Sequence, residues 1–123
     1  MKKILVVDDH MHLRELIEVA LRGRHRQILH AENGEEAFAL ARTELPNLIL
    51  LDIMLPGGID GFEVARRLRK CSETADCVIL AVTAKAQQFD RIEAEQAGVD
   101  GYLAKPFTLT QLRTRVNALI GED

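Results

Sequence analysis

Side chains able to do chemistry follow four separate short apolar segments of this chain, at the point where each segment ends. Taken one at a time, an Asp or Thr after a strand is more often a turn residue or a helix cap, and a Lys-Pro pair is more often a loop. Three carboxylates, one hydroxyl and one ammonium group in the same position on four segments instead predict one shared site. In chain order the residues are Asp8, Asp9, Asp52, Thr83 and Lys105.

This set of side chains is suited to binding a divalent cation and a phosphoryl group. Carboxylates that lie close together repel one another unless a cation offsets their charge. Mg²⁺ is bound in proteins by one or two carboxylates and keeps positions open for phosphate oxygens. Lys105 and Thr83 could hold the other phosphoryl oxygens, and an aspartate can be the nucleophile that forms an acyl phosphate. The residues therefore predict phosphoryl transfer by positioning and charge neutralisation.

Five repeats of a strand followed by a helix would position these residues. Between the apolar runs, apolar residues recur at helical spacing, although the helix expected over residues 87–97 has a narrow apolar face. Asn33 and Asp60 are expected N-caps, and Thr108 with Gln111 fits a capping box. The expected strands are residues 4–7, 27–31, 48–51, 78–82 and 102–104.

Strands that alternate with helices build an α/β fold, in which a parallel sheet is covered by helices on both faces. The runs at residues 4–7, 48–51 and 78–82 are wholly apolar and belong in the centre of the sheet, whereas the other two contain polar residues and belong at its edges. The doubly wound strand order 2-1-3-4-5 meets this requirement. Ligands of such sheets bind at the carboxyl ends of the strands where the order reverses, here between the first and third strands.

Length and composition exclude several classes of protein. The 123 residues are read as one domain, residues 1–123, and the 47% apolar and 28% charged residues are typical of a soluble globular chain. The net charge of −3 gives no reason to expect nucleic-acid binding by this domain, and no apolar run approaches a membrane span. The chain lacks the Gly-rich phosphate loops of nucleotide-binding proteins. Cys71 and Cys77 are too widely spaced for a C-x-x-C pair and are expected to be free thiols in the cytoplasm.

Three other clusters have competing interpretations. His10 and His12, beside Asp8-Asp9, could indicate a zinc site, but exposure at the start of the first helix is the simpler interpretation. Two basic clusters are expected to complement helix dipoles and stay solvated. They comprise Arg22, Arg24, His25 and Arg26 after the first helix and Arg66, Arg67, Arg69 and Lys70 near the end of the third.

The set of strand-end residues resembles the receiver domain of two-component response regulators, with similarity to the chemotaxis response regulator. The resemblance covers almost the whole chain and is carried by residues 4–9, 50–56, 60–61 and 97–107. It implies the flavodoxin-like receiver fold. One departure is the loop Gly57-Gly58-Ile59, which has three residues where the family usually has two, and which we expect to be longer and looser.

The resemblance implies a role for each residue of the site. Asp52 would accept the phosphoryl group, and Mg²⁺ would be bound by Asp9, Asp52 and the backbone carbonyl of Met54, with Asp8 acting directly or through water. Lys105 would pair with the phosphoryl oxygens, and a cis Lys105–Pro106 bond would direct its side chain over the site. Thr83 and Tyr102 would be the switch residues.

The resemblance also implies partners. A histidine kinase or phosphotransfer protein would supply the phosphoryl group. The face formed by the fourth helix, fifth strand and fifth helix would then control an output domain or effector protein. The domain is expected to be N-terminal, and to be no enzyme beyond phosphorylating itself and slowly losing the phosphoryl group. Two alternatives stay open: a small Mg²⁺-dependent aspartyl phosphotransferase or phosphatase acting on metabolites, and an interaction module that is never phosphorylated.

Overall fold

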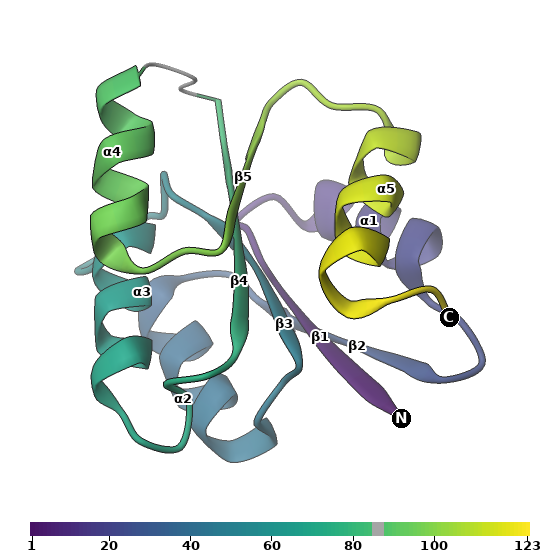
Figure 1. Ribbon diagram of the computed structural model, residues 1–123, viewed down its shortest axis with the longest axis horizontal. Coiled ribbons are helices and arrows are strands. Elements are labelled where there is room, and N and C mark those ends of the chain that lie inside the picture. The colour runs from purple at the N-terminus through teal and green to yellow at the C-terminus, as the bar shows by residue number, and fades with distance from the viewer. Residues whose placement is uncertain (85–87) are drawn as a thin grey trace.

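The computed structural model of this chain describes residues 1–84 and 88–123, and in these residues five strands alternate with five helices (Figure 1). The strands are β1 (Lys2–Val7), β2 (Arg26–Ala31), β3 (Leu48–Asp52), β4 (Val78–Thr83) and β5 (Gly101–Ala104). The helices are α1 (Met11–Leu21), α2 (Gly34–Glu44), α3 (Gly61–Lys70), α4 (Gln88–Ala97) and α5 (Leu109–Ile120). Each expected element is present, and no boundary of an expected strand differs by more than two residues. The expected helix start at Gln87 lies outside the described residues.

All neighbouring strands run parallel, and their order in the sheet is β2-β1-β3-β4-β5, which confirms the predicted topology. Helices α1 and α5 cover one face of the sheet, and α2, α3 and α4 cover the other (Figure 1). The parallel register places Val7 beside Leu51 and Asp52 beside Val82. The carboxyl ends of the central strands therefore lie together at one edge of the sheet.

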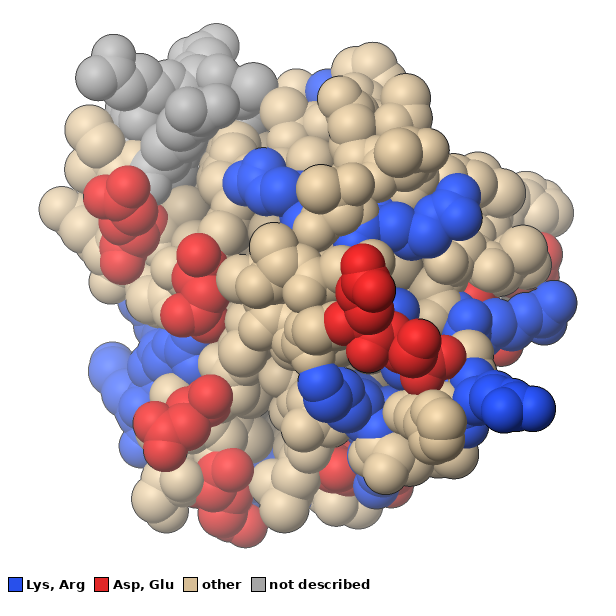
Figure 2. Space-filling view, turned by 45° about the vertical axis from the view of Figure 1, so that its right-hand side comes forward, with Lys and Arg blue, Asp and Glu red and all other residues tan. Residues whose placement is uncertain are grey.

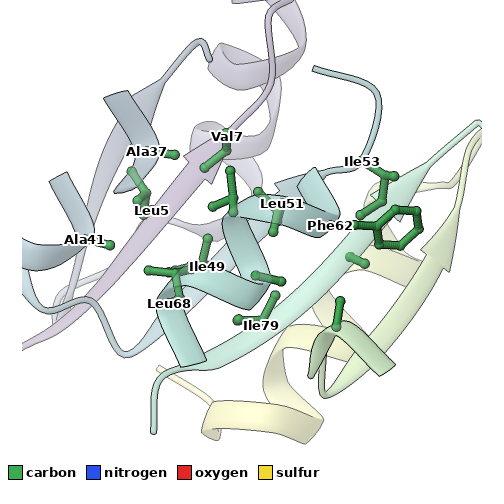
Figure 3. Packing of buried hydrophobic residues seen from close by; sticks show 14 of the residues in the cluster. Leu5, Val7, Ala37, Ala41, Ile49, Leu51, Ile53, Phe62, Leu68 and Ile79 are labelled. Atoms are coloured by element: carbon green, nitrogen blue, oxygen red, sulfur yellow. The ribbon is translucent and has the colours of Figure 1, made fainter. Parts of the chain in front are cut away.

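Apolar residues on the central strands form a core on each face of the sheet. All five residues of β3 are buried, because successive side chains point to opposite faces and both faces are covered. Ile49 and Leu51 pack with α2 and α3 (Figure 3), while Leu48 and Leu50 pack with α1 and α5. Burying one such side chain contributes roughly 2 kcal/mol to folding. The two cores hold the strand ends in fixed positions.

The expected helix caps are confirmed. The side chains of Asn33 and Asp60 accept hydrogen bonds from backbone amides of α2 and α3, and Thr108 and Gln111 form a reciprocal capping box. Each cap satisfies an amide that would otherwise have no partner in the first helical turn. The caps of α2 and α3 also fix where these helices start beside the carboxyl edge of the sheet.

The loop with the extra residue is held by one of its own side chains. Ile59 is half-buried and packs against the core, so that a Cβ added at Gly34 would lie 2.5 Å from its Cγ1. Gly57 has a φ of 93°, which favours glycine. Ile59 therefore anchors the end of this loop to the start of α2.

One face of the molecule carries charged side chains of both signs (Figure 2). On the face shown in Figure 2, Lys and Arg side chains are interspersed with Asp and Glu. A domain that binds nucleic acid usually has a basic patch or stripe instead. None of the described helices has the length and apolar character needed to cross a membrane.

The expectation that the first basic cluster stays solvated is wrong for Arg26. This side chain is buried, and its guanidinium donates to the carbonyl of Leu21 and to Asn117 Oδ1 and the Gly121 carbonyl, the last two at 2.9 and 2.6 Å. Helix C-termini leave carbonyls without partners, which Arg can satisfy. Arg26 therefore joins the ends of α1 and α5 to the start of β2.

The second basic cluster also differs from expectation at one residue. Arg69 donates to the backbone carbonyls of Ala75, Cys77 and Gly98 and forms an ion pair of 2.8 Å with Asp100. These bonds connect the end of α3 to the segments before β4 and β5. Cys71 and Cys77 are free thiols, as predicted.

Replacing Arg26 with Met should lower the free energy of unfolding by about 2 kcal/mol, because buried carbonyls lose their donor. The matched control is Arg24→Met, at an exposed position of the same cluster, which should change it by less than about 0.5 kcal/mol. Urea denaturation of the three proteins measures both values. Equal stability of the Arg26 variant and the parent would contradict the structural role of this side chain.

Candidate phosphoacceptor site

Four strand ends bring the predicted residues to one place. Asp8 follows β1, Asp52 is the last residue of β3, and Thr83 is the last residue of β4. Lys105 follows β5, and its side chain reaches back across the carboxyl edge of the sheet to the first two carboxylates. Gly61 permits α3 to start there, because a Cβ at this position would lie 2.4 Å from the Asp52 carbonyl oxygen.

The ammonium of Lys105 bridges two buried carboxylates. Its Nζ lies 2.9 Å from Asp8 Oδ2 and 3.5 Å from Asp52 Oδ2. The Lys105–Pro106 peptide bond is cis, as the resemblance implied, and the Lys105 amide donates to the Thr83 carbonyl at 2.8 Å. Among the described residues, no other Lys or Arg forms an ion pair with these two carboxylates. One cation is therefore shared by two buried anions.

Asp8 and Asp52 have different hydrogen-bond partners. Asp8 Oδ2 accepts from Lys105, and its Oδ1 accepts from the backbone amide of His10 at 2.8 Å. Asp52 Oδ1 accepts from the amide of Met54 at 3.0 Å, while its Oδ2 lies beyond the usual hydrogen-bond length from Lys105. Asp8 is consequently the better stabilised carboxylate of the two.

These contacts shift the pKa values of Asp52 and Asp8 in opposite directions. Burial raises the pKa of Asp52 to about 6, which the charge of Lys105 and the Met54 amide only partly oppose, and the charge of Asp8 raises it further. Burial also disfavours the charge on Asp8, but the hydrogen bonds from Lys105 and His10 outweigh it, and the pKa of Asp8 is lowered. For Lys105, burial is outweighed by the bond to Asp8 and the charge of Asp52, so its pKa is raised.

The raised pKa of Asp52 should make the stability of the metal-free protein depend on pH. Because the pKa of Asp52 is higher in the folded state than the ordinary 3.8, the protein loses stability as pH rises from about 4 to 6 and does not regain it above 6. Asp52→Asn should therefore stabilise the protein at pH 7.5 by about 3 kcal/mol, with the difference disappearing near pH 4. Denaturation in chelator at both pH values measures it. The control, Asp76→Asn at an exposed position, should show no such pH dependence, and a less stable Asp52 variant at pH 7.5 would contradict the assigned burial cost.

Asp9 is the most open of the three carboxylates. Its side chain is 37% exposed, against 4–5% for Asp8 and Asp52. Asp8, Asp9 and His10 each offer one atom that could bind a metal ion, and these three atoms lie within 4.8 Å of one another. Carboxylate oxygens beside an incompletely neutralised buried anion fit a hard divalent cation such as Mg²⁺. The structure thus supports the predicted kind of cation at this edge, with Asp52 connected to the group through Lys105.

The two predicted switch residues lie on neighbouring strands. Thr83 is 1% exposed at the end of β4, and Tyr102 is half-buried in β5, where it packs against the core beneath α4. Arg115 of α5 donates to the Tyr102 carbonyl at 2.7 Å. A hollow of about 410 Å³ between α4, β5 and α5 is lined by Glu95, Tyr102 and Arg115 among others. Thr83 ends the strand that pairs with the strand of Tyr102, and Tyr102 lines this hollow.

Two contacts at the site were not predicted from the sequence. Arg14 donates to the backbone carbonyl of Asp8 at 2.6 Å, and the ring of His10 lies beside both Asp8 and Asp9. The contact of Arg14 could have been predicted, because a basic residue in the first turns of the helix after an acidic pair lies close to that pair. His12, in contrast, is 93% exposed, as expected, and its Nδ1 lies 3.9 Å from Glu15 Oε2.

A five-stranded sheet of this order, with carboxylates and a Lys where the strand order reverses, defines a doubly wound α/β domain, a class of fold whose ligands bind at the strand ends. Residues 4–117 match the family described as the response regulator receiver domain, and the chain belongs to this family.

Curated relatives support this assignment over nearly the whole chain. The chain is 42% identical to the phosphate regulon transcriptional regulatory protein PhoB of Pseudomonas aeruginosa, over 97% of this chain and 52% of that protein. It is 37% identical to the protein PilH of the same organism, over 98% of both chains. The chain thus spans about half the length of PhoB and nearly all of PilH.

Solved structures share the fold. A putative response regulator from Chloroflexus aurantiacus superposes with a TM-score of 0.89 at 35% identity, covering 98% of both chains. The receiver domain of the sensor histidine kinase PA1611 from Pseudomonas aeruginosa has a TM-score of 0.86 at 33% identity, covering 98% of both chains. That structure contains a magnesium ion coordinated in its active-site cleft. This chain is a receiver domain, a class of module whose function is phosphoryl acceptance and switching.

Proposed function

We propose that Asp52 is the phosphoryl acceptor of this receiver domain. The observation that carries the proposal is the contrast between the two buried carboxylates. Both oxygens of Asp8 are engaged by good hydrogen bonds, whereas Oδ2 of Asp52 lies 3.5 Å from Lys105. The raised pKa of Asp52 also marks a more basic and hence more nucleophilic carboxylate than the lowered pKa of Asp8 does.

The cation site that we propose uses the residues implied by the resemblance to receiver domains. Asp9 and Asp52 would supply carboxylate oxygens, Met54 its backbone carbonyl, and Asp8 an oxygen directly or through water. Mg²⁺ bound there would neutralise charge on the phosphoryl oxygens and on the attacking carboxylate. The carboxylates are already held in place without it, because Lys105 and backbone amides orient Asp8 and Asp52.

The transfer itself needs one nucleophile and two groups that hold the phosphoryl oxygens. Asp52 Oδ2 attacks the phosphorus of a phosphohistidine, the P–N bond breaks, and its electron pair stays on the departing imidazole nitrogen. The product is an acyl phosphate on Asp52. Lys105 exchanges part of its interaction with Asp52 for a phosphoryl oxygen, and the Thr83 hydroxyl donates to another. The reaction ends on the chain's own side chain, so no separate substrate is turned over.

The acyl phosphate would act as the switch. Once the Thr83 hydroxyl binds the phosphoryl group, the population in which Tyr102 turns inward would increase, which changes the surface between α4, β5 and α5. An output domain or effector protein would bind that surface, and a cytoplasmic histidine kinase or phosphotransfer protein would be the donor. The length of PhoB, about twice that of this chain, is the reason to consider an attached output domain.

Incubation with a small acyl-phosphate donor tests the proposal without a cognate kinase. With Mg²⁺ present, intact-mass measurement should show one added phosphoryl group per chain, and with excess chelator it should show none. A chain that gains no phosphate with Mg²⁺ would instead be an unphosphorylated interaction module, and the proposal would be wrong.

A further inference from the structure

The imidazole of His10 lies against the cation site from the solvent side. Its Nδ1 is 3.0 Å from Asp8 Oδ1 and 3.2 Å from Asp9 Oδ1, although 70% of the side chain is exposed. His10 precedes α1 as its N-cap but makes no side-chain cap hydrogen bond. Helix capping therefore does not explain why its ring faces the two carboxylates.

The imidazole of His10 can be joined to the carboxylates of Asp8 and Asp9 in two ways. Carboxylate oxygens are acceptors only, so the imidazole nitrogen that faces them is joined to them by a hydrogen or by a cation. Ligand atoms at right angles on an ion with bonds of about 2.1 Å are about 3 Å apart. The separations of 3.0 and 3.2 Å match that spacing as well as they match a hydrogen bond.

We propose that His10 Nδ1 is a further ligand of the divalent cation held at the proposed site, on the side of Asp8 and Asp9, and that it gives this site a preference for borderline transition-metal ions such as Co²⁺ and Zn²⁺ over Mg²⁺. Imidazole binds Zn²⁺ and its neighbours well, whereas Mg²⁺ favours oxygen ligands and gains little from a nitrogen. This inference rests on the proposed cation site and adds a ligand to it.

The backbone contribution of His10 is separable from that of its ring. The amide of residue 10 donates to Asp8 Oδ1 whatever side chain is present, so replacing the ring leaves this bond in place. His10→Phe keeps a planar side chain and removes the nitrogen. The matched control is His12→Phe, which removes an exposed imidazole two residues away whose nearest acid is Glu15 at 3.9 Å. Both variants retain Cys71 and Cys77, so thiol binding of metal is the same in each.

Dissociation constants for Co²⁺ and Mg²⁺ should be measured by isothermal titration calorimetry at one fixed pH for the parent and both variants. We expect His10→Phe to weaken Co²⁺ binding about tenfold or more, while Mg²⁺ binding changes less than about twofold. His12→Phe should leave both constants unchanged. In the parent, ¹⁵N-histidine spectra with Co²⁺ should show a paramagnetic shift of the His10 nitrogen.

Three results would overturn the inference. An equal loss of affinity for both ions would show that the ring acts only by its shape or position. Tighter binding of both ions to His10→Phe would show that the imidazole competes with the cation. Unchanged Co²⁺ binding would show that Nδ1 is not a ligand. A parent that binds Mg²⁺ in any of these cases leaves the proposed function intact, whereas a parent that binds neither ion contradicts the cation site itself.

Discussion

Replacing Asp52 with Asn should abolish phosphate incorporation from a small phosphodonor, with a loss of about a thousandfold or more in rate. An amide oxygen is a far weaker nucleophile than a carboxylate, and no other carboxylate in the described site is both buried and free of strong hydrogen bonds on one oxygen. Intact-mass measurement over a time course with Mg²⁺ gives the rate for the parent and the variant.

The control for this prediction is Asp76→Asn, which removes a carboxylate from an exposed position of the segment between α3 and β4. It should be phosphorylated at the rate of the parent. If Asp52→Asn still gains one phosphoryl group at a comparable rate, then another side chain is the acceptor, and the contrast between Asp8 and Asp52 has been misinterpreted.

Lys105→Met should slow phosphorylation by about a hundredfold, because the ammonium is the cation placed to neutralise the phosphoryl oxygens. The same change should lower the free energy of unfolding at pH 7.5 by about 3 kcal/mol, since two buried carboxylates lose their shared counter-ion. The loss should shrink toward pH 4. Without Lys105, the folded-state pKa of both carboxyls rises, and such groups cost stability only as pH rises above the unfolded value.

Lys70→Met, at an exposed position of α3, is the control for the Lys105 variant and should change neither quantity much. Urea denaturation at pH 7.5 and pH 4 separates the two effects. An Lys105 variant as stable as the parent at pH 7.5 would contradict the ion pairs, and one that is phosphorylated at the parent's rate would contradict the role of the ammonium.

The fold could be predicted because the patterns that indicate it most clearly are short and continuous in the sequence. The central runs at residues 4–7, 48–51 and 78–82 are wholly apolar, and a parallel sheet covered on both faces requires this of its central strands. Strand order then brought Asp8, Asp52, Thr83 and Lys105 to one edge, and the structure places them there. These residues lie together because of the order of the strands in the sheet.

What the sequence could not provide depends on contacts between distant residues. Arg26 looked like one more basic residue after a helix, yet Asn117 and Gly121 at the end of α5 bury its guanidinium. The resemblance named Asp52 as the acceptor, but the burial that raises its pKa, and the partners that lower the pKa of Asp8, are visible only in the structure. The position of the His10 ring depends on side-chain rotation, which the spacing of residues does not specify.

The proposed acyl phosphate is carried by the Asp52 side chain, and its position in the chain can be determined directly. Reductive trapping with borohydride after Mg²⁺-dependent phosphorylation converts an aspartyl phosphate to homoserine, and peptide mass spectrometry then locates the converted residue. We expect homoserine at position 52 and nowhere else. Conversion at position 8 or 9, or a phosphoryl group that resists borohydride and maps to a histidine, would contradict it.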